Sequence, residues 1–207
     1  CSIGDVTHRI QASELQDKGV LANCHVNVLQ TQDHPMFKTY AEELKWLTTD
    51  KVRMAWVAKT IKDVSTSGNT LVLVDRISAG EILQEQLEGS VFVSGSTKNV
   101  DRKEQYDEVS TATNKIIIAT YGVASVGINI PRIFNLVLIE PGKSFVRVIQ
   151  SIGRGIRKAE DKENVQIWDI TSSCKFAKRH LGARKKFYKE ANYPYTIEKI
   201  NYENPYT

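Results

Sequence analysis

Thr70-Leu-Val-Leu-Val-Asp75 is a short aliphatic run that ends in a carboxylate. Comparable apolar runs follow at residues 90–94, 115–119, 134–140 and 165–170. Continuous apolar runs of this length are typical of strands that are buried on both faces of a sheet. Amphipathic stretches separate them, so strands and helices alternate along the chain. This alternation predicts an α/β fold with a parallel sheet that is flanked by helices and joined by right-handed crossovers.

The helices between these strands have recognisable starts and faces. Ser78-Ala-Gly-Glu81 has the spacing of a capping box, in which a hydroxyl and a carboxylate satisfy N–H groups at a helix start. The apolar face of this helix is predicted to contain Ala79, Ile82, Leu83 and Leu87. Further helices are predicted near residues 99–112, 144–153 and 174–191.

Residues 1–69 have a different pattern. The segment from Cys24 to Gln30 predicts one short strand. A helix follows whose apolar face is predicted to contain Val52, Trp56, Ile61 and Val64. The polar cluster at residues 65–69 ends this helix and precedes the first strand of the sheet.

Composition limits the class of protein. The chain has 207 residues, 41% of them hydrophobic, which suffices for one domain with an appendage or for two small domains. Its formal net charge of +4 permits a polyanionic partner but does not require one. No apolar run approaches the roughly 20 residues that span a bilayer, and no secretory signal is visible. The chain begins at Cys1 without an initiator Met, so we expect it to belong to a longer protein.

The three cysteines carry little functional information. Cys1, Cys24 and Cys174 are far apart, and no C-x-x-C or Cys/His cluster is present, so no metal site is predicted. Isolated cysteines fit a reducing compartment. We therefore expect the protein in the cytoplasm, which would be that of the host cell if a phage encodes it.

The polar segments that follow the predicted strands form the candidate site. Ligands bind at the carboxyl ends of the strands in an open parallel sheet. The distinctive segments at these ends are Asp75 to Ser78, Ser94 to Thr97, Thr120 to Pro131 and Pro141 to Ser144. We therefore place the candidate site on the carboxyl edge of the sheet.

Gln150-Ser-Ile-Gly-Arg-Gly-Ile-Arg157 follows these segments and reads Q-x-x-G-R-x-x-R. Arg154 and Arg157 are three residues apart, so they share one face of a helix. Their planar, permanently charged guanidinium groups match phosphate oxygens, and the neighbouring glycine permits close approach. The pattern is also compatible with a solvated basic helix end, where cations are favourable.

The order of these segments resembles the second RecA-like domain of superfamily 2 helicases, which has the fold of P-loop NTPases. The matching segments are Asp75 with motif IV, Ser94-Gly95 and Arg102 with motif IVa, Thr120–Pro131 with motif V, and Gln150–Arg157 with motif VI. The resemblance covers roughly residues 70–170, and residues 10–30 resemble the segment that leaves the first RecA-like domain. The sequence of residues 151–157 is similar to the corresponding segment of recombination helicases and of restriction-enzyme motors.

The resemblance implies a role for each motif residue at an ATP site. Arg157 matches the arginine finger that reaches the γ-phosphate across the domain cleft. Arg154 matches the arginine that contacts phosphate or holds the interface closed. Gln150 matches the polar residue that orients this helix and reaches the nucleotide or the other domain. Gly127 and Asn129 match motif V positions beside the ribose and phosphates. Many relatives have Asp in place of Asn129, which questions a ribose or catalytic-water role there.

Other matching positions would hold the nucleic-acid backbone. Ser94, Gly95 and Thr120 offer hydroxyl and main-chain N–H donors, which recognise phosphates without reading bases. Arg102 matches a motif IVa position, and Lys143 lies in the loop after the fourth of the five strands. The resemblance makes Arg102 a further candidate for a contact with the backbone, and Lys143 in its strand-end loop is at most a backbone contact.

The segment from Cys174 onward is basic and contains interleaved aromatic residues. Arg184, Lys185 and Lys186 are its candidate nucleic-acid-binding residues. The alternative is an amphipathic helix that docks its aromatic residues on the domain and leaves its lysines in solvent. We expect the aromatic residues to dock, and both interpretations stay open for the lysines.

Two motifs that a complete motor needs are absent. Gly142-Lys143-Ser144 is not a Walker A loop, because Val137 stands where the earlier glycine is required, and Asp107-Glu108 does not form the acidic magnesium motif. The resemblance therefore implies half of an ATP site. The expected cofactor is ATP with Mg²⁺, and the magnesium is held by the N-terminal RecA-like domain of the same protein. Alone, the chain is expected to be inactive.

These observations predict three parts: residues 1–31, the end of a first motor domain or an interdomain linker; residues 32–173, the RecA-like helicase domain; and residues 174–207, a basic helical extension. The resemblance implies the C-terminal motor half of a monomeric, ATP-dependent DNA helicase or translocase. Its substrates would be branched or forked DNA in recombination, repair and replication-fork rescue. The alternatives are an RNA helicase, a restriction-enzyme motor or a non-catalytic nucleic-acid-binding module. A small-molecule α/β enzyme ranks last, because no G-x-S-x-G or comparable site is present.

Overall fold

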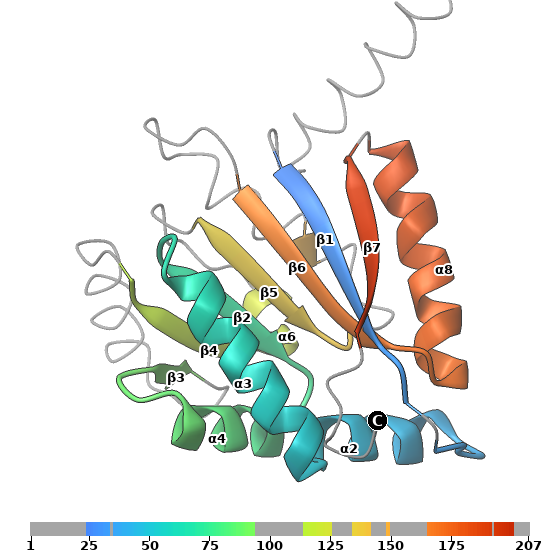
Figure 1. Cartoon of the computed structure of the whole chain (residues 1–207), viewed down its shortest axis with the longest axis horizontal. Coiled ribbons are helices and arrows are strands. Elements are labelled where there is room, and N and C mark those ends of the chain that lie inside the picture. The colour runs from blue at the N-terminus through green and yellow to red at the C-terminus, as the bar shows by residue number, and fades with distance from the viewer. Residues whose placement is uncertain are drawn as a thin grey trace, which may run out of the picture.

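The computed structural model describes residues 24–33, 35–93, 114–125, 134–141, 148–149, 165–191 and 193–200. The strands are β1 (Cys24–Thr31), β2 (Thr70–Val74), β3 (Val91–Val93), β4 (Ile116–Thr120), β5 (Asn135–Ile139), β6 (Val165–Ser172) and β7 (Tyr195–Ile200). The helices are α2 (Tyr40–Thr49), α3 (Lys51–Ser65), α4 (Ile77–Gln86), α6 (Tyr121–Ser125) and α8 (Lys175–Glu190). The described strands form one sheet in the order β3-β4-β2-β5-β6-β1-β7 (Figure 1).

The predicted parallel α/β fold is confirmed. All six strand pairings in the described residues are parallel. In the centre, Val72 of β2 pairs with Ile118 of β4 and with Val137 of β5, and all three side chains are buried. The five apolar runs that predicted strands correspond to β2, β3, β4, β5 and β6. Burial on both faces explains why these runs are continuous rather than alternating.

The helices cover both faces of the sheet. Alternate residues of β2 point to opposite sides, because side chains alternate along a strand. Leu71 belongs to a core cluster with residues of α6 and α8, whereas Val72 belongs to a second cluster with residues of α3 and α4. Helix α2 lies across the ends of the strands, next to the first turn of α8 (Figure 1). The domain therefore has three layers, and α2 covers part of one edge.

Two helix predictions need correction. Val52 is 56% exposed, and α3 instead buries Arg53, Val57 and Ile61, which are spaced by four residues. The predicted capping box is wrong, because α4 begins at Ile77 and Ser78 lies exposed within its first turn. The expected apolar face of α4 is confirmed: Ala79, Leu83 and Leu87 are buried, and Ile82 packs against the same core.

The predicted boundaries at residues 31 and 174 do not separate structural units in the described residues. β1 is an inner strand, where Val26 pairs with Ile167 of β6 and with Tyr195 of β7. α8 packs on this sheet and β7 extends it. β7 was not predicted because it is an edge strand with four consecutive exposed residues, and α2 was not predicted either. The predicted helix at 99–112 and most of the one at 144–153 lie outside the described residues.

Uncharged side chains close the amino edge of the sheet. The Oδ1 atom of Asn69 accepts a hydrogen bond from the backbone N–H of Lys115 at 2.8 Å. The Nδ2 atom of Asn135 donates to the carbonyl of Val64 at 3.1 Å, and its Oδ1 accepts from Nε1 of Trp168 at 3.3 Å. These amides tie the end of α3 to the beginnings of the central strands.

Candidate nucleotide and nucleic-acid interface

Thr120 is the last residue of β4 and begins the predicted motif V segment. Its side chain is half-buried, and its Oγ1 accepts a hydrogen bond from the backbone N–H of Val123 at 3.3 Å. A hydroxyl that accepts in this way keeps its hydrogen for another acceptor, such as a phosphate oxygen. Thr120 therefore lies on the carboxyl edge, and its contact with nucleic acid stays a prediction.

Most predicted site residues lie outside the described part of the chain. They are Ser94, Gly95, Arg102, Gly127, Asn129, Lys143, Gln150, Arg154 and Arg157. The described residues that precede them end at the carboxyl edge: Val93 ends β3, α6 follows β4, and Pro141 follows β5. On the motif VI side, the helical residues Val148 and Ile149 precede Gln150 and are fully buried. The roles of the nine residues stay predictions.

Side chains from three other elements hold the exit from β5. This exit consists of Ile139, Glu140 and Pro141. Tyr121 of α6 donates its hydroxyl hydrogen to the carbonyl of Ile139 at 2.9 Å. Arg53 of α3 contacts the Glu140 carboxylate at 2.6 Å. Arg184 of α8 donates to the carbonyl of Pro141 at 2.7 Å. Because Glu140 has a φ of 45°, which few non-glycine residues adopt, these contacts fix an unusual backbone turn.

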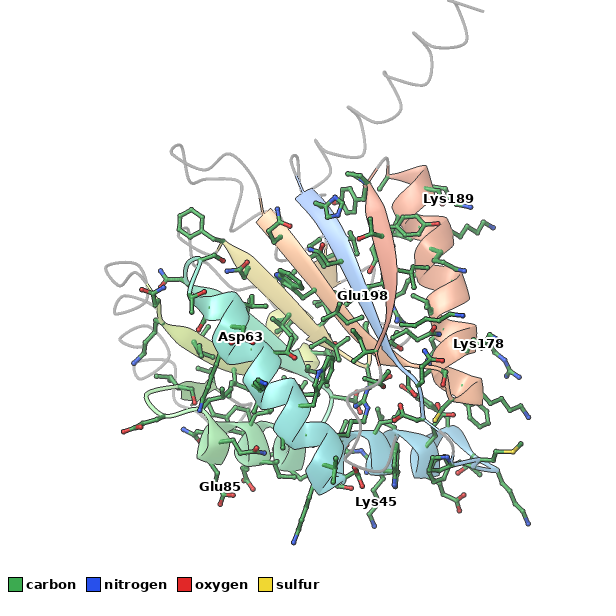
Figure 2. The ribbon with its side chains drawn as sticks, in the orientation of Figure 1. Lys45, Asp63, Glu85, Lys178, Lys189 and Glu198 are labelled. Atoms are coloured by element: carbon green, nitrogen blue, oxygen red, sulfur yellow. The ribbon has the colours of Figure 1, made fainter. Side chains whose placement is uncertain are left out.

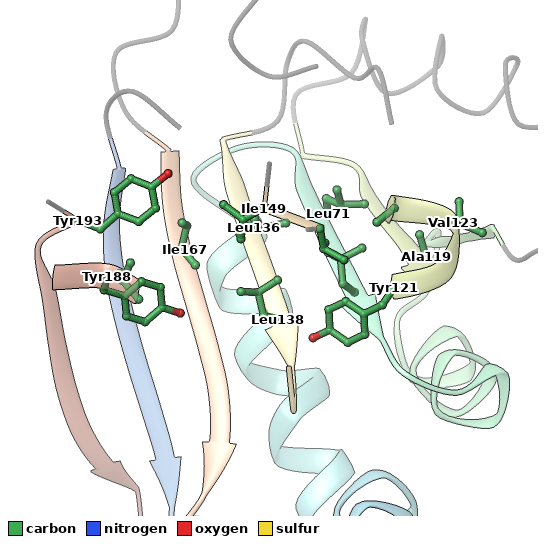
Figure 3. Packing of buried hydrophobic residues seen from close by; sticks show 14 of the residues in the cluster. Leu71, Ala119, Tyr121, Val123, Leu136, Leu138, Ile149, Ile167, Tyr188 and Tyr193 are labelled. Atoms are coloured by element: carbon green, nitrogen blue, oxygen red, sulfur yellow. The ribbon is translucent and has the colours of Figure 1, made fainter. Parts of the chain in front are cut away.

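Tyr121 also connects the two predicted motif segments through the core. Its ring belongs to the buried cluster that contains Leu138 of β5 and Ile149 (Figure 3). Burial raises the pKa of Tyr121 well above its ordinary value, so the phenol stays protonated and keeps its donor. The first residue of α6 therefore shares a core with the residue that precedes Gln150.

Arg53 is the centre of a buried network on the carboxyl edge. Its guanidinium donates to the carbonyl of Leu47 at 2.6 Å, to Oγ1 of Thr31 at 3.2 Å and to the carbonyl of Thr171 at 3.3 Å. A buried charge is tolerated when it is paired and hydrogen-bonded in this way. Sequence reasoning missed Arg53, although a cation in the middle of an apolar helix face was a usable signal.

Burial also changes the acidity of this network. It raises the pKa of Glu140 from 4.5 to about 7, although the positive charges of Arg53 and Arg184 lower it. The desolvation of the carboxylate thus outweighs its attraction to two guanidinium groups. Glu140 is therefore a group on this edge that changes its protonation near neutral pH.

The structure contradicts the prediction that Arg184 binds nucleic acid. Its side chain is 3% exposed, and its Nε and Nη2 atoms donate to the Asp169 carboxylate at 2.7 and 3.0 Å. The hydroxyl of Tyr188 donates to the same carboxylate at 2.7 Å. The prediction was wrong because helical spacing places residue 184 with Leu181 and Tyr188 on the face toward the sheet.

The neighbouring lysines point elsewhere. Lys186 is exposed and Lys185 is half-buried, so both lie away from the face that carries Arg184. The expected docking of aromatic residues is confirmed by Tyr188, which is buried, and by Phe187, which packs against the same core. Binding of nucleic acid by the two lysines stays a prediction.

The described part of the chain contains no group of three or more His, Cys, Asp or Glu residues that could hold a metal ion. Within the same ranges, no helix has both the length and the apolar character needed to cross a membrane.

A parallel sheet with helices on both faces, and with polar and glycine-containing segments following its carboxyl ends, is the architecture of RecA-like domains. Residues 52–159, just over half of the chain, match the helicase conserved C-terminal domain, and the chain belongs to this family. The predicted resemblance to the second RecA-like domain of superfamily 2 helicases is confirmed.

Two relatives are similar in sequence. The chain is 28% identical to the ATP-dependent DNA helicase UvsW of Enterobacteria phage T4 over 220 residues, which cover 96% of the chain and 44% of UvsW. It is 33% identical over 104 residues to Putative helicase 22 of Sulfolobus islandicus filamentous virus, covering 48% of the chain and 18% of that protein. The chain thus spans less than half the length of these relatives.

Solved structures share the fold. The crystal structure of T4 UvsW has a TM-score of 0.75 at 23% identity and covers 87% of the chain and 42% of UvsW. The E. coli DEAD-box protein SrmB, bound to a regulator of ribonuclease activity, has a TM-score of 0.60 at 18% identity, and the match covers 90% of this chain and 96% of the SrmB chain in that structure. At these identities the structural matches show the fold alone.

Proposed function

We propose that this chain is the C-terminal motor half of an ATP-dependent DNA helicase or translocase. The observation that supports the proposal most strongly is positional. The segments with the patterns of motifs V and VI begin next to Tyr121 and Ile149, which belong to one buried cluster, in a chain of the helicase C-terminal family. A motor needs such a connection, because nucleotide hydrolysis must be linked to the grip on nucleic acid.

The proposed chemistry divides between two domains. Phosphoryl transfer depends on positioning and on stabilisation of negative charge. ATP with Mg²⁺, held by the N-terminal RecA-like domain, supplies the phosphoryl group. Arg157 approaches the γ-phosphate when the domains close, while Arg154 contacts phosphate and Gln150 orients their helix. Gly127 and Asn129 lie beside the ribose and phosphates. Because the arginines arrive only on closure, hydrolysis is coupled to domain movement.

The proposed grip on nucleic acid uses the backbone. Ser94, Gly95, Arg102, Thr120 and Lys143 contact phosphates without reading bases. Similarity to a phage DNA helicase supports DNA as the substrate. We include in the proposal branched or forked DNA in recombination, repair and replication-fork rescue, and action as a monomer in the cytoplasm.

ATP hydrolysis by the chain, alone and mixed with the N-terminal motor domain, tests this proposal. We expect no turnover alone and DNA-stimulated turnover in the mixture. Arg157→Ala should lower turnover by about 10³-fold, the order of magnitude known for arginine fingers. Lys158→Ala removes a neighbouring charge outside the motif and serves as the matched control, which should stay within threefold, or roughly 0.6 kcal/mol, of the unmodified chain.

The alternatives give different results. ATP turnover by the chain alone would contradict the proposal that this chain supplies only half of the ATP site. An inactive mixture of folded, associated domains would contradict the motor and favour a non-catalytic binding module. Stronger stimulation by RNA than by DNA of the same sequence would favour an RNA helicase.

A further inference from the structure

Helix α8 carries a row of basic side chains on the side away from the sheet. These residues, called here the basic face of α8, are Lys175, Lys178, Arg179, Lys185, Lys186 and Lys189. At 3.6 residues per turn they occupy an arc of about 120°, which is separate from the buried face with Leu181 and Tyr188. All are exposed except Lys185, which is half-buried. Figure 2 shows Lys178 and Lys189 extending outward from the helix.

The basic face is not neutralised by acidic partners in the described residues. The arginines in the ion pairs described there are Arg53 and Arg184, both buried. Lys175 and Arg179 instead lie beside Phe176, with each charged group 5.5 Å from the ring centre. The positive charges of the basic face therefore reach solvent.

Local stability does not explain the basic N-terminal end of α8. Cations near a helix N-terminus are unfavourable, because the helix dipole is positive there. The first turn of α8 contains Lys175 and no acidic residue. The structure offsets this with Glu43 of α2, whose buried carboxylate accepts from the backbone N–H groups of Phe176 and Ala177 at 2.9 and 2.8 Å. Because these N–H groups are occupied, an anion at this end would have to contact side chains.

The described charges are distributed unevenly across the sheet. The exposed acidic residues of α4 and the turn after it are Glu81, Glu85 and Glu88. α4 covers the side with β3, whereas α8 lies next to β7 at the opposite edge (Figure 2). An electric field of this polarity directs a polyanion toward α8.

The geometry of this face is suited to a duplex. Lys175 and Lys189 are about 21 Å apart along the helix axis, at 1.5 Å per residue. The aromatic side chains of Phe176 and Phe187 lie beside the basic face rather than on it, so no stacking platform for unpaired bases is present on the described face. We propose that the basic face of α8 binds the phosphate backbone of duplex DNA without reading its sequence. This contact requires no ATP. It is separate from Thr120 at the end of β4, because α8 packs on β6 and β4 and β6 are three strands apart, or about 14 Å.

Two variants with equal charge changes test the proposal. In the first, Lys178, Lys186 and Lys189 of α8 are each changed to Gln. In the control, the exposed Lys45, Lys51 and Lys62 of α2 and α3 are each changed to Gln. Fluorescence anisotropy with a labelled 20-base-pair duplex, without nucleotide, measures Kd between 50 and 200 mM salt. Thermal denaturation confirms that both variants fold.

We expect the α8 variant to bind at least tenfold more weakly and to lose about two to three units of the slope of log K against log salt. The control should change Kd by less than threefold. Equal weakening in both variants, or none in either, would overturn the proposal. So would tighter binding of a single strand of equal length, or a matching loss of binding to anionic phospholipid vesicles.

Discussion

The two edges of the sheet are closed by different chemistry. At the amino edge, Asn69 and Asn135 connect strands and helix ends through neutral amides. At the carboxyl edge, Arg53 and Arg184 form buried ion pairs with Glu140 and Asp169. Neutral hydrogen bonds hold the strands and helix ends together at the amino edge, where the chain only turns. Buried charges occur where the segments proposed to contact nucleotide and nucleic acid begin.

This difference affects how each edge responds to change. Removing one member of a buried ion pair leaves the other charge without compensation, which costs more than the net gain from the intact pair. Removing a neutral amide leaves polar groups unsatisfied at a smaller cost. Losses at the carboxyl edge should therefore be larger and should depend on pH.

Arg53→Met should have the largest effect on folding. It leaves the carboxylate of Glu140 buried and removes hydrogen bonds to Thr31 and Leu47. We expect the free energy of unfolding in urea to fall by about 3–5 kcal/mol. Combining it with Glu140→Gln should recover part of this loss, because without Arg53 the buried carboxyl group must either stay unpaired as a carboxylate or take up a proton. A loss below about 1 kcal/mol would show that water, another cation or the uptake of a proton by Glu140 compensates for the missing guanidinium.

Asn135→Ala measures the amino edge in the same assay. Asn135 is 1% exposed, so its loss leaves the carbonyl of Val64 and Nε1 of Trp168 without this partner. The expected loss is about 1–3 kcal/mol, the cost of buried groups left unsatisfied. Asn114→Ala on the same edge is the matched control, because exposed Asn114 can be replaced by water at the carbonyl of Ser65. Equal losses in both variants would remove burial as the cause.

The sequence predicted the neutral framework better than the charged one. The apolar strands followed from burial on both faces, a property of each local run. The role of Arg184 did not follow, because a basic run looks the same whether one of its members turns inward or not. Its partner Asp169 lies 15 residues away in an apolar strand, and Glu140 lies 87 residues from Arg53. Contacts between segments this distant have no local pattern.

β7 shows a second limit of sequence reasoning. Its residues Thr196 to Lys199 are exposed, so no apolar run marks the strand, and backbone pairing with β1 defines it. The same limit applies to the candidate site. Thr120 could be placed on the carboxyl edge because it ends a predicted strand. The hydrogen bond from Tyr121 to the exit from β5 could be recognised only in the folded structure.

The pH dependence of stability distinguishes the edges further. The pKa of Glu140 is raised by burial from 4.5 to about 7, so the folded protein binds its proton more tightly than the unfolded chain. This contribution to stability is full below roughly pH 4.5 and is lost as pH rises through about 7. Between pH 6 and 8 the loss should be about 1 kcal/mol.

Glu140→Gln is the control for this titration, because it keeps an oxygen acceptor and cannot ionise. Urea unfolding of both proteins across this pH range, compared as a difference, isolates Glu140 from other titrating groups. Parallel curves would mean that the ion pair with Arg53 keeps the carboxylate charged throughout.

Glu43→Gln should produce the smallest effect and tests whether charge matters at the helix end on the carboxyl edge. Glu43 accepts hydrogen bonds from two N–H groups of α8, and Gln keeps one oxygen acceptor but loses the charge that opposes the helix dipole. We expect a loss of about 0.5–1 kcal/mol in thermal or urea unfolding. Glu42 precedes Glu43 and is exposed, so Glu42→Gln should lower the free energy of unfolding by less. If the two variants lose equal stability, the charge of Glu43 does not matter and its side chain acts only as a hydrogen-bond acceptor for the N-terminus of α8. This part of the carboxyl edge would then resemble the neutral amino edge.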